Sequence, residues 1–187
     1  MKFLKGLGLC IISIVCAFLL LAAGTQIYKL ILGGMDVRLI GTEWDQEKPM
    51  VPGETIDVHP AAKNDSKRVG AYVFISLSTT YALHDSGKPT ELFGYDVNDG
   101  WAQVDEEWKD GAVVRTFAYG TEEELAELPA GETTVPVMDG IVFELMVRQE
   151  NLPSEGLRRN FDIRSVGSNF NAKGKAAKEV WESVKWM

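Results

Sequence analysis

The side chains that most often act as nucleophiles or zinc ligands are few in this chain and do not form catalytic motifs. Its 187 residues include two histidines, His59 and His84, and neither lies in an H-E-x-x-H sequence, which would direct two imidazoles at one zinc ion. Both cysteines, Cys10 and Cys16, lie in an apolar N-terminal segment, and no G-x-S-x-G sequence marks a serine nucleophile. We therefore assign no catalytic residues and expect a protein that is not an enzyme.

Acidic side chains in loops are the remaining candidates for metal chemistry. Calcium prefers oxygen ligands, which Asp96, Asn98 and Asp99 could supply from one turn. Their spacing is not that of a calcium-loop motif, and neighbouring carboxylates in loops are usually just solvated. The sequence therefore predicts no cofactor, with these three residues as the candidates for a weak calcium site.

Tryptophan offers a different kind of binding surface. The chain has five: Trp44, Trp101, Trp108, Trp181 and Trp186. Their ordinary role is packing in the core or at its rim, where large aromatic rings bury much apolar area. Grouped on one exposed face, they would instead suit a monomeric surface module that binds a glycan or a cation, and this alternative stays open.

The balance of charge bears on possible partners. The chain has 27 Asp and Glu against 19 Lys and Arg, a formal net charge of −8. An acidic domain repels phosphate backbones, so no nucleic-acid partner is expected.

The first 27 residues have the layout of an export signal. Lys2 and Lys5 precede residues 7–24, a run of 18 residues without charge, and small residues close the run. A run of this length is also at the lower limit of a membrane span. Segment 1–27 is therefore predicted to be a signal peptide or a retained membrane-anchor helix, and the domain to be extracellular or at the cell surface. The region where a signal peptidase would cut comprises Ala22, Ala23, Gly24, Thr25 and Ile27.

After a linker at 28–34, residues 35–187 are predicted to form one all-β domain. Short runs of alternating apolar and polar residues, separated by turn signals, favour a jelly-roll or Ig-like antiparallel β-sandwich. Within one run, Ser76 and Ser78 alternate as solvent-facing residues would, and Asp110-Gly111 predicts a hairpin turn. The predicted strands are residues 35–40, 55–59, 71–80, 101–108, 112–119, 141–148 and 161–166.

The end of the chain has helical spacing instead. Ala177, Val180, Trp181 and Val184 recur at intervals of three and one, so an amphipathic C-terminal helix is predicted within residues 171–187. Residues 122–128 are predicted to add one helical turn between strands.

Several of these segments, taken in order, resemble the TasA/camelysin family of exported Gram-positive proteins. The similar segments are VRLIGTEWD at 37–45, MVPGE at 50–54, Asn64, AYVFI at 71–75, ELF at 91–93, NDGW at 98–101, LPAGETT at 128–134 and the final AKEVWESV. The resemblance covers most of residues 20–185 and implies a jelly-roll sandwich, processing by a SipW-type signal peptidase, and a role in extracellular fibres of the biofilm matrix. Camelysin-type members have also been called metalloproteases, so a metal-dependent peptidase is a more distant alternative.

The resemblance also implies a mode of assembly. In such proteins an N-terminal segment completes the sheet of the next subunit, which is strand addition through main-chain hydrogen bonds. Segment 28–34 would then be a donor strand, and self-assembly or a related fibre subunit would supply the partner. The acceptor is expected at an edge strand within 71–80 or 141–148. The predicted donor residues are Tyr28, Leu30, Ile31, Leu32, Val37 and Leu39.

Overall fold

The longest strand of the described chain, β4 (Ala71–Leu83), organises the larger of two antiparallel layers. The computed structural model describes residues 34–43, 51–83, 89–109, 111–144, 159–172 and 174–187. β4 pairs with β10 (Arg159–Gly167) and with β8 (Ala112–Tyr119), and β7 (Trp101–Lys109) completes the order β10-β4-β8-β7. The short strand β5 (Pro89–Glu91) pairs with the end of β4.

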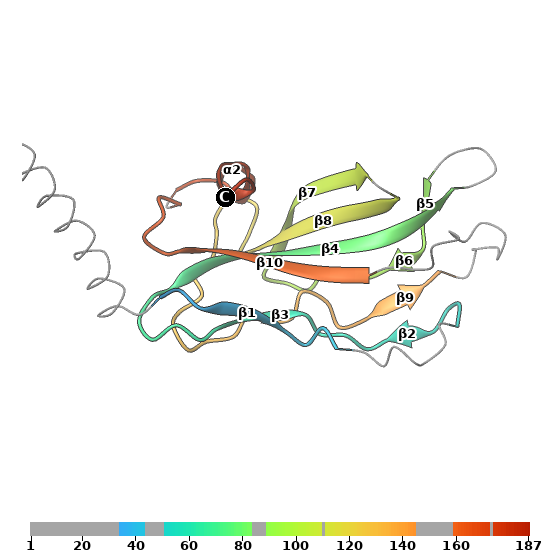
Figure 1. Ribbon diagram of the computed structural model, residues 1–187, viewed down its shortest axis with the longest axis horizontal. Helices are drawn as coiled ribbons and strands as arrows, with labels where there is room; N and C mark the ends of the chain where they lie inside the picture. Colours follow the sequence, from blue (N-terminus) through green and yellow to red (C-terminus); the bar gives the residue numbers. More distant parts are fainter. Residues whose placement is uncertain (1–33, 44–50, 84–88, 110, 145–158, 173) are drawn as a thin grey trace, which may run out of the picture.

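The other layer is built from shorter strands. β1 (Val37–Ile40) pairs with β3 (Ala61–Asn64), and β9 (Ile141–Phe143) lies between β2 (Thr55–Ile56) and β6 (Phe93–Gly94). These strands lie below the larger sheet in Figure 1. The fold is therefore all-β, as predicted.

The main hydrophobic core lies between the two layers. Side chains alternate along a strand, so β4 directs Val73, Ile75 and Leu77 to its inner face, and the register places Phe117 opposite Ile75. Burial of each such side chain contributes roughly 1.5–3 kcal/mol before the entropy of ordering is subtracted. Other core residues with almost no exposed surface are Val58, Leu92, Leu128, Val137, Met138 and Ile141.

A second, smaller core lies on the outer face of the larger sheet, under the helix α2 (Ala177–Val184). The helix packs one apolar face against Phe74 and Val104 of the sheet, and in Figure 1 it lies across one end of that face. The amphipathic C-terminal helix predicted from the sequence is thereby confirmed. Its buried side chains are Ala177, Val180, Trp181 and Val184.

A β-bulge in β7 decides which of its side chains reach each face. The pairing with β8 runs from Gln103 opposite Phe117 to Asp105 opposite Thr116, so Val104 is the extra residue. Val104 packs in the core under α2, and Asp105 accepts a hydrogen bond from the indole of Trp181 on the same side. Glu106 is then left opposite Arg115 on the inner side.

Most predicted strands are present, but two expectations need correction and one strand was missed. Residues 122–128 form no helical turn, because the backbone of Leu128 pairs with Ala71 instead. The strand predicted at 55–59 ends after Ile56, since the amide of His59 donates to the carbonyl of Gly41. The strand β3 was not predicted, because its AAKN sequence has no β-branched residue.

The apolar N-terminal segment lies outside the described residues, and so do all five predicted cleavage-region residues. Within the part of the chain that the structure describes, no helix has the length and apolar character needed to cross a membrane.

Candidate functional site

The predicted calcium loop lies between β6 and β7. Asp96 and Asp99 are exposed there, whereas the amide nitrogen of Asn98 donates to the carbonyl of Pro136 at 3.3 Å. That hydrogen bond uses the amide nitrogen and joins the loop to residue 136. Among the described residues, no group of three or more His, Cys, Asp or Glu side chains is placed to hold a metal ion.

One of the two histidines, His59, lies among the described residues. His59 lies at the surface with its Nδ1 3.4 Å from a carboxylate oxygen of Asp139, and both side chains are more than half exposed. His84 lies outside the described residues. This exposed pair is a surface contact of small energetic effect.

The tryptophans are divided among three environments. Trp101 belongs to the inner core, and Trp181 belongs to the core under α2. Trp108 packs beside Tyr81 with ring centroids 5.2 Å apart, while Trp186 at the C-terminus is 87% exposed. Trp44 lies outside the described residues. The exposed tryptophan face expected of a binding module is therefore not formed by the described residues.

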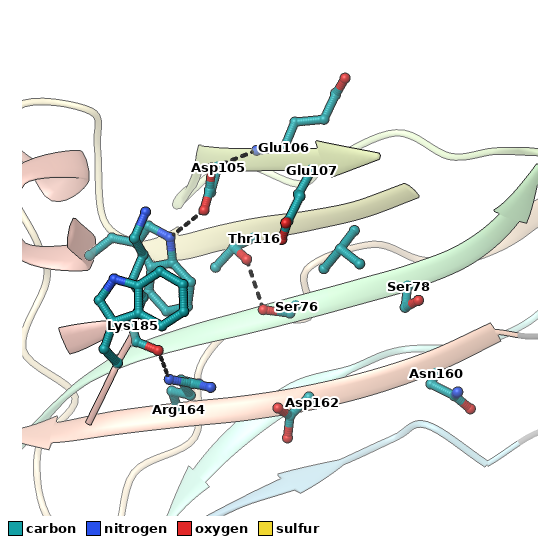
Figure 2. Close-up of a pocket in the computed structure, with 13 residues that line it drawn as sticks. Ser76, Ser78, Asp105, Glu106, Glu107, Thr116, Asn160, Asp162, Arg164 and Lys185 are labelled. Carbon is teal, nitrogen blue, oxygen red and sulfur yellow. Dashed lines mark hydrogen bonds between the residues drawn. The ribbon is translucent and has the colours of Figure 1, made fainter. Parts of the chain in front are cut away.

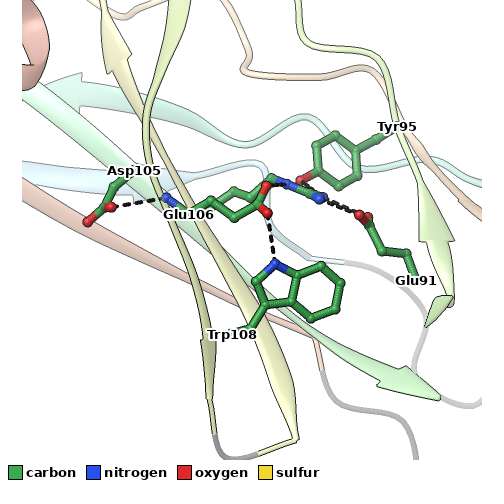
Figure 3. A network of polar contacts seen from close by, with 6 residues as sticks. Glu91, Tyr95, Asp105, Glu106 and Trp108 are labelled. Carbon is green, nitrogen blue, oxygen red and sulfur yellow. Dashed lines mark hydrogen bonds and ion pairs between the residues drawn. The ribbon is translucent and has the colours of Figure 1, made fainter. Parts of the chain in front are cut away.

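A network around Arg115 is the most extensive polar cluster that the described side chains form (Figure 3). Its guanidinium donates to both carboxylate oxygens of Glu91, to Glu106 at 2.7 Å and to the Tyr95 hydroxyl at 3.2 Å. The indole of Trp108 donates to the other oxygen of Glu106 at 2.7 Å. Because Glu91 and Glu106 share the one guanidinium of Arg115, the network joins β5, β7 and β8 rather than offering a reactive group.

These contacts change the acid–base behaviour of the cluster. The hydrogen bonds from Trp108 and then from Arg115 hold the pKa of Glu106 below its ordinary value. The hydrogen bond to Glu91 is the largest cause of the raised pKa of Arg115, and the bonds to Tyr95 and Glu106 add to it. Burial raises the pKa of Tyr95. Glu106 and Arg115 thus stay charged at neutral pH, while the Tyr95 hydroxyl stays protonated.

We expect the protein to lose stability in acid partly through Glu106. A carboxylate whose folded pKa is depressed contributes stability above its unfolded value, here 4.5, and loses it as the pH falls through the folded value. Urea denaturation at a series of pH values should show a shallower loss of unfolding free energy below about 4.5 in Glu106→Gln than in the unchanged protein. Glu123→Gln, at an exposed position, is the matched control; an equally steep acid loss in Glu106→Gln would contradict this role.

The side of the molecule where β1 and β10 meet is the least covered part of the main core. Six hydrophobic residues that pack on this core are only partly buried, and four of them come from these two strands. They are Val37, Leu39, Phe161 and Ile163. β1 and β10 are in contact across the two layers. In Figure 1 they are neighbours, with β10 in the larger layer and β1 in the other. We call these four residues and the two strands the open edge.

The open edge also has unpaired strand backbone within the described chain. β10 pairs there only with β4, and β1 only with β3. An unpaired row of amides and carbonyls is a template for another strand. The opposite edge strand, β7, is better protected, because it carries the bulge and the acidic residues Asp105, Glu106 and Glu107.

This arrangement corrects the predicted acceptor strands and places part of the predicted donor. β4 lies between β10 and β8, and β9 lies between β2 and β6, so neither strand is an edge; residues 145–148 of the second predicted acceptor lie outside the described residues. Of the donor residues, Val37 and Leu39 lie in β1, opposite Asn64 and Ala62 of the same chain. Tyr28, Leu30, Ile31 and Leu32 lie outside the described residues.

A groove on the outer face of the larger sheet is a second candidate site (Figure 2). It has a volume of about 520 Å³ and lies beside α2. The sequence predicted that Ser76 and Ser78 face outward, and they form part of its floor. The groove itself was not predicted, since its two sides come from strands far apart in the chain.

Comparison of the chain with protein-family models, with curated proteins and with solved structures gives no match.

Proposed function

We propose that this chain is an exported structural protein of the cell surface or biofilm matrix, a fibre subunit or an accessory that anchors fibres. Copies would assemble by adding a strand of one molecule to the open edge of the next, or of a related subunit. The observation that carries this proposal is the group of half-buried apolar side chains along the unpaired edge of β1 and β10. The resemblance to the TasA/camelysin family supports the same function.

The fold we propose is a jelly-roll or Ig-like antiparallel β-sandwich that is incomplete at this edge. An added strand would bury more of Val37, Leu39, Phe161 and Ile163, at about 25 cal/mol for each Å² of apolar surface removed from water. It would also supply hydrogen-bond partners to the backbone of β10. Both terms favour an extended, apolar segment as the occupant.

Residues 28–34 of another copy have the required composition. In an extended backbone, Tyr28, Leu30 and Leu32 would lie on one side, with Lys29 and Ile31 on the other. The apolar side would face the core and Lys29 would face solvent. In this proposal the N-terminal segment directs export and is cut off by a signal peptidase, or it stays in the membrane when it is uncleaved.

Deleting residues 28–34 should abolish fibres and leave a folded monomer, because the β1–β3 ladder and both cores remain. Electron microscopy and sedimentation would measure the fibres, and circular dichroism the fold. Leu30→Asp should act like the deletion, whereas Lys29→Asp, on the opposite side of the segment, should leave fibres unchanged. Fibres of unchanged yield from the deletion variant would refute the donor assignment.

A trapping experiment would identify the acceptor directly. Both native cysteines lie at positions 10 and 16, so they can be replaced by alanine to give a background without thiols. Mixing a Leu30→Cys copy with a Ser165→Cys copy should give a disulfide-linked heterodimer, since Ser165 lies in β10. Assembly without this cross-link would place the donor on another edge.

Ligand binding by a monomer is the second candidate function, and the outer groove is the observation that favours it. The peptidase alternative has a simple test, because stoichiometric zinc in the purified protein would support it.

A further inference from the structure

The outer groove has a floor of small hydroxyl side chains between two raised sides. Ser76 and Ser78 of β4 and Thr116 of β8 form the floor, and the hydroxyls of Ser76 and Thr116 are 2.8 Å apart. Figure 2 shows Asp105 and Glu107 on the β7 side, and Asn160 and Asp162 on the β10 side. Strands neighbour one another at about 4.8 Å, so three intervals separate the two sides by roughly 14 Å. The volume of about 520 Å³ lies within the usual range for ligand sites.

Both hydrogen-bond donors and acceptors line this groove. The hydroxyls and the Asn160 amide can donate and accept, while the carboxylates accept only. The carboxylates of Asp105, Glu107 and Asp162 line the groove together with Arg164 and Lys185, whereas the carboxylate of Glu106 binds Arg115 on the inner side. Lys185 already pairs with Glu182 at 2.7 Å, and Arg164 donates to the backbone carbonyl of Lys185. The groove therefore favours a ligand with hydroxyl groups and positive charge.

An exposed indole stands at the end of the groove next to α2. Trp186 lines the groove and is 87% exposed, so its ring contributes little to packing. The ammonium of Lys185 lies 5.5 Å from its ring centroid, which is a cation–π distance. Arg164 lies in a similar position over Trp181, 5.8 Å from the centroid. Aromatic rings at this end of the groove thus already hold cationic groups of the protein.

These features together suit an amino sugar better than a metal ion or a peptide. Within the described chain no three potential metal ligands converge, the groove included. A pyranose ring offers hydroxyls to the floor and an apolar face to an indole, and its ammonium group matches the carboxylates. We propose that the outer groove binds a short chain of amino sugars with free amines, with Trp186 as the stacking residue and Asp162 as a carboxylate that contacts an ammonium group.

The test is isothermal titration of the full chain with short oligomers. The β-1,4-linked glucosamine tetramer should bind. Its fully N-acetylated form keeps the rings and loses the charges. We expect its Kd to be at least about tenfold higher. Tetralysine, which keeps the charges and has no rings, should be weaker by a similar factor.

Two pairs of variants locate the site. Trp186→Ala should weaken binding of the glucosamine tetramer about tenfold, whereas Met187→Ala, at the next exposed position, should stay within about twofold. Asp162→Asn should weaken it about three- to tenfold, whereas Asp96→Asn, an exposed acid away from the groove, should not. All four substitutions replace exposed side chains, so folding is expected to be retained.

Each outcome decides for or against the proposal. No binding of the glucosamine tetramer would overturn it, as would tetralysine binding equally well, which would show a general attraction for polycations. Equal binding of the N-acetylated tetramer would overturn the role of the charges. Loss of affinity in the control variants equal to that in Trp186→Ala would place the ligand elsewhere. The groove lies on the face of the sheet and not at the open edge, so these results are independent of fibre assembly.

Discussion

Replacing Asn64 by alanine is expected to lower the free energy of unfolding by about 3–5 kcal/mol, the largest effect of any single polar substitution that we predict. Asn64 has no exposed surface. Its amide nitrogen donates to the carbonyls of Val69 and Leu128, at 2.9 and 3.0 Å, and its carbonyl oxygen accepts from the amide of Ser66 at 3.1 Å. Alanine would remove all three hydrogen bonds at once.

The cost is high because the Ser66 amide and the Val69 carbonyl stay in place without the side chain, whereas the Leu128 carbonyl keeps its hydrogen bond from the amide of Ala71. A buried polar group left without a partner costs about 1–3 kcal/mol, more than the net gain from forming the bond. The backbone of Asn64 is also central, since its amide donates to Glu132 and its carbonyl accepts from Gly131. The residue thus joins β3, the start of β4 and the turn near residue 131.

Urea denaturation followed by fluorescence would measure this effect. Asn98→Ala is the matched control, because that side chain donates one hydrogen bond, to Pro136 at 3.3 Å, and should cost at most about 1 kcal/mol. A loss in Asn64→Ala no larger than that in Asn98→Ala would show that water or local relaxation satisfies the freed groups.

Replacing Trp181 by alanine should cost about 3–5 kcal/mol and release α2 from the sheet. The indole is 6% exposed, its ring lies 5.3 Å from that of Phe74, and its nitrogen donates to Asp105 at 2.8 Å. The other buried residues of the helix are small, so Trp181 supplies most of the apolar area that holds it. An isolated helix of this length is not stable in water, so loss of docking should unfold it.

Hydrogen exchange would separate local release from global unfolding. In Trp181→Ala, the amides of α2 should exchange faster than those of β4 and β8, which retain the inner core. Trp186→Ala is the control, since its 87% exposed ring should contribute less than about 0.5 kcal/mol. Equal protection of α2 in both variants would show that contacts other than the indole hold the helix.

The periodicity of the sequence was enough to predict the long elements. β7 and β10 alternate apolar and polar residues, β4 and β8 are rich in β-branched and aromatic residues, and each strand appears within a few residues of its predicted bounds. The four buried residues of α2 are those that helical spacing selected. These predictions succeed because side-chain direction is a local property of helix and strand.

The predictions that failed concern segments whose structure depends on distant partners. Residues 122–128 have the composition of a helix, yet Leu128 forms two backbone hydrogen bonds with Ala71. β3 has weak strand propensity and exists because β1 pairs with it on one side and the backbone of residues 132–134 bonds to it on the other. In both cases a partner far along the chain outweighs the local preference.

The sequence by itself determined the strand pattern, the C-terminal helix, the acidic charge and the absence of common catalytic motifs, because each is a matter of composition or local spacing. Only the tertiary structure decided the sites. The open edge, the Arg115 network and the outer groove each combine side chains from strands that are distant in sequence, so they depend on strand order and register. The local patterns that predict β4 and β10 cannot show that the first is central and the second an edge, because they report strand propensity and side-chain direction and not which strand lies beside it.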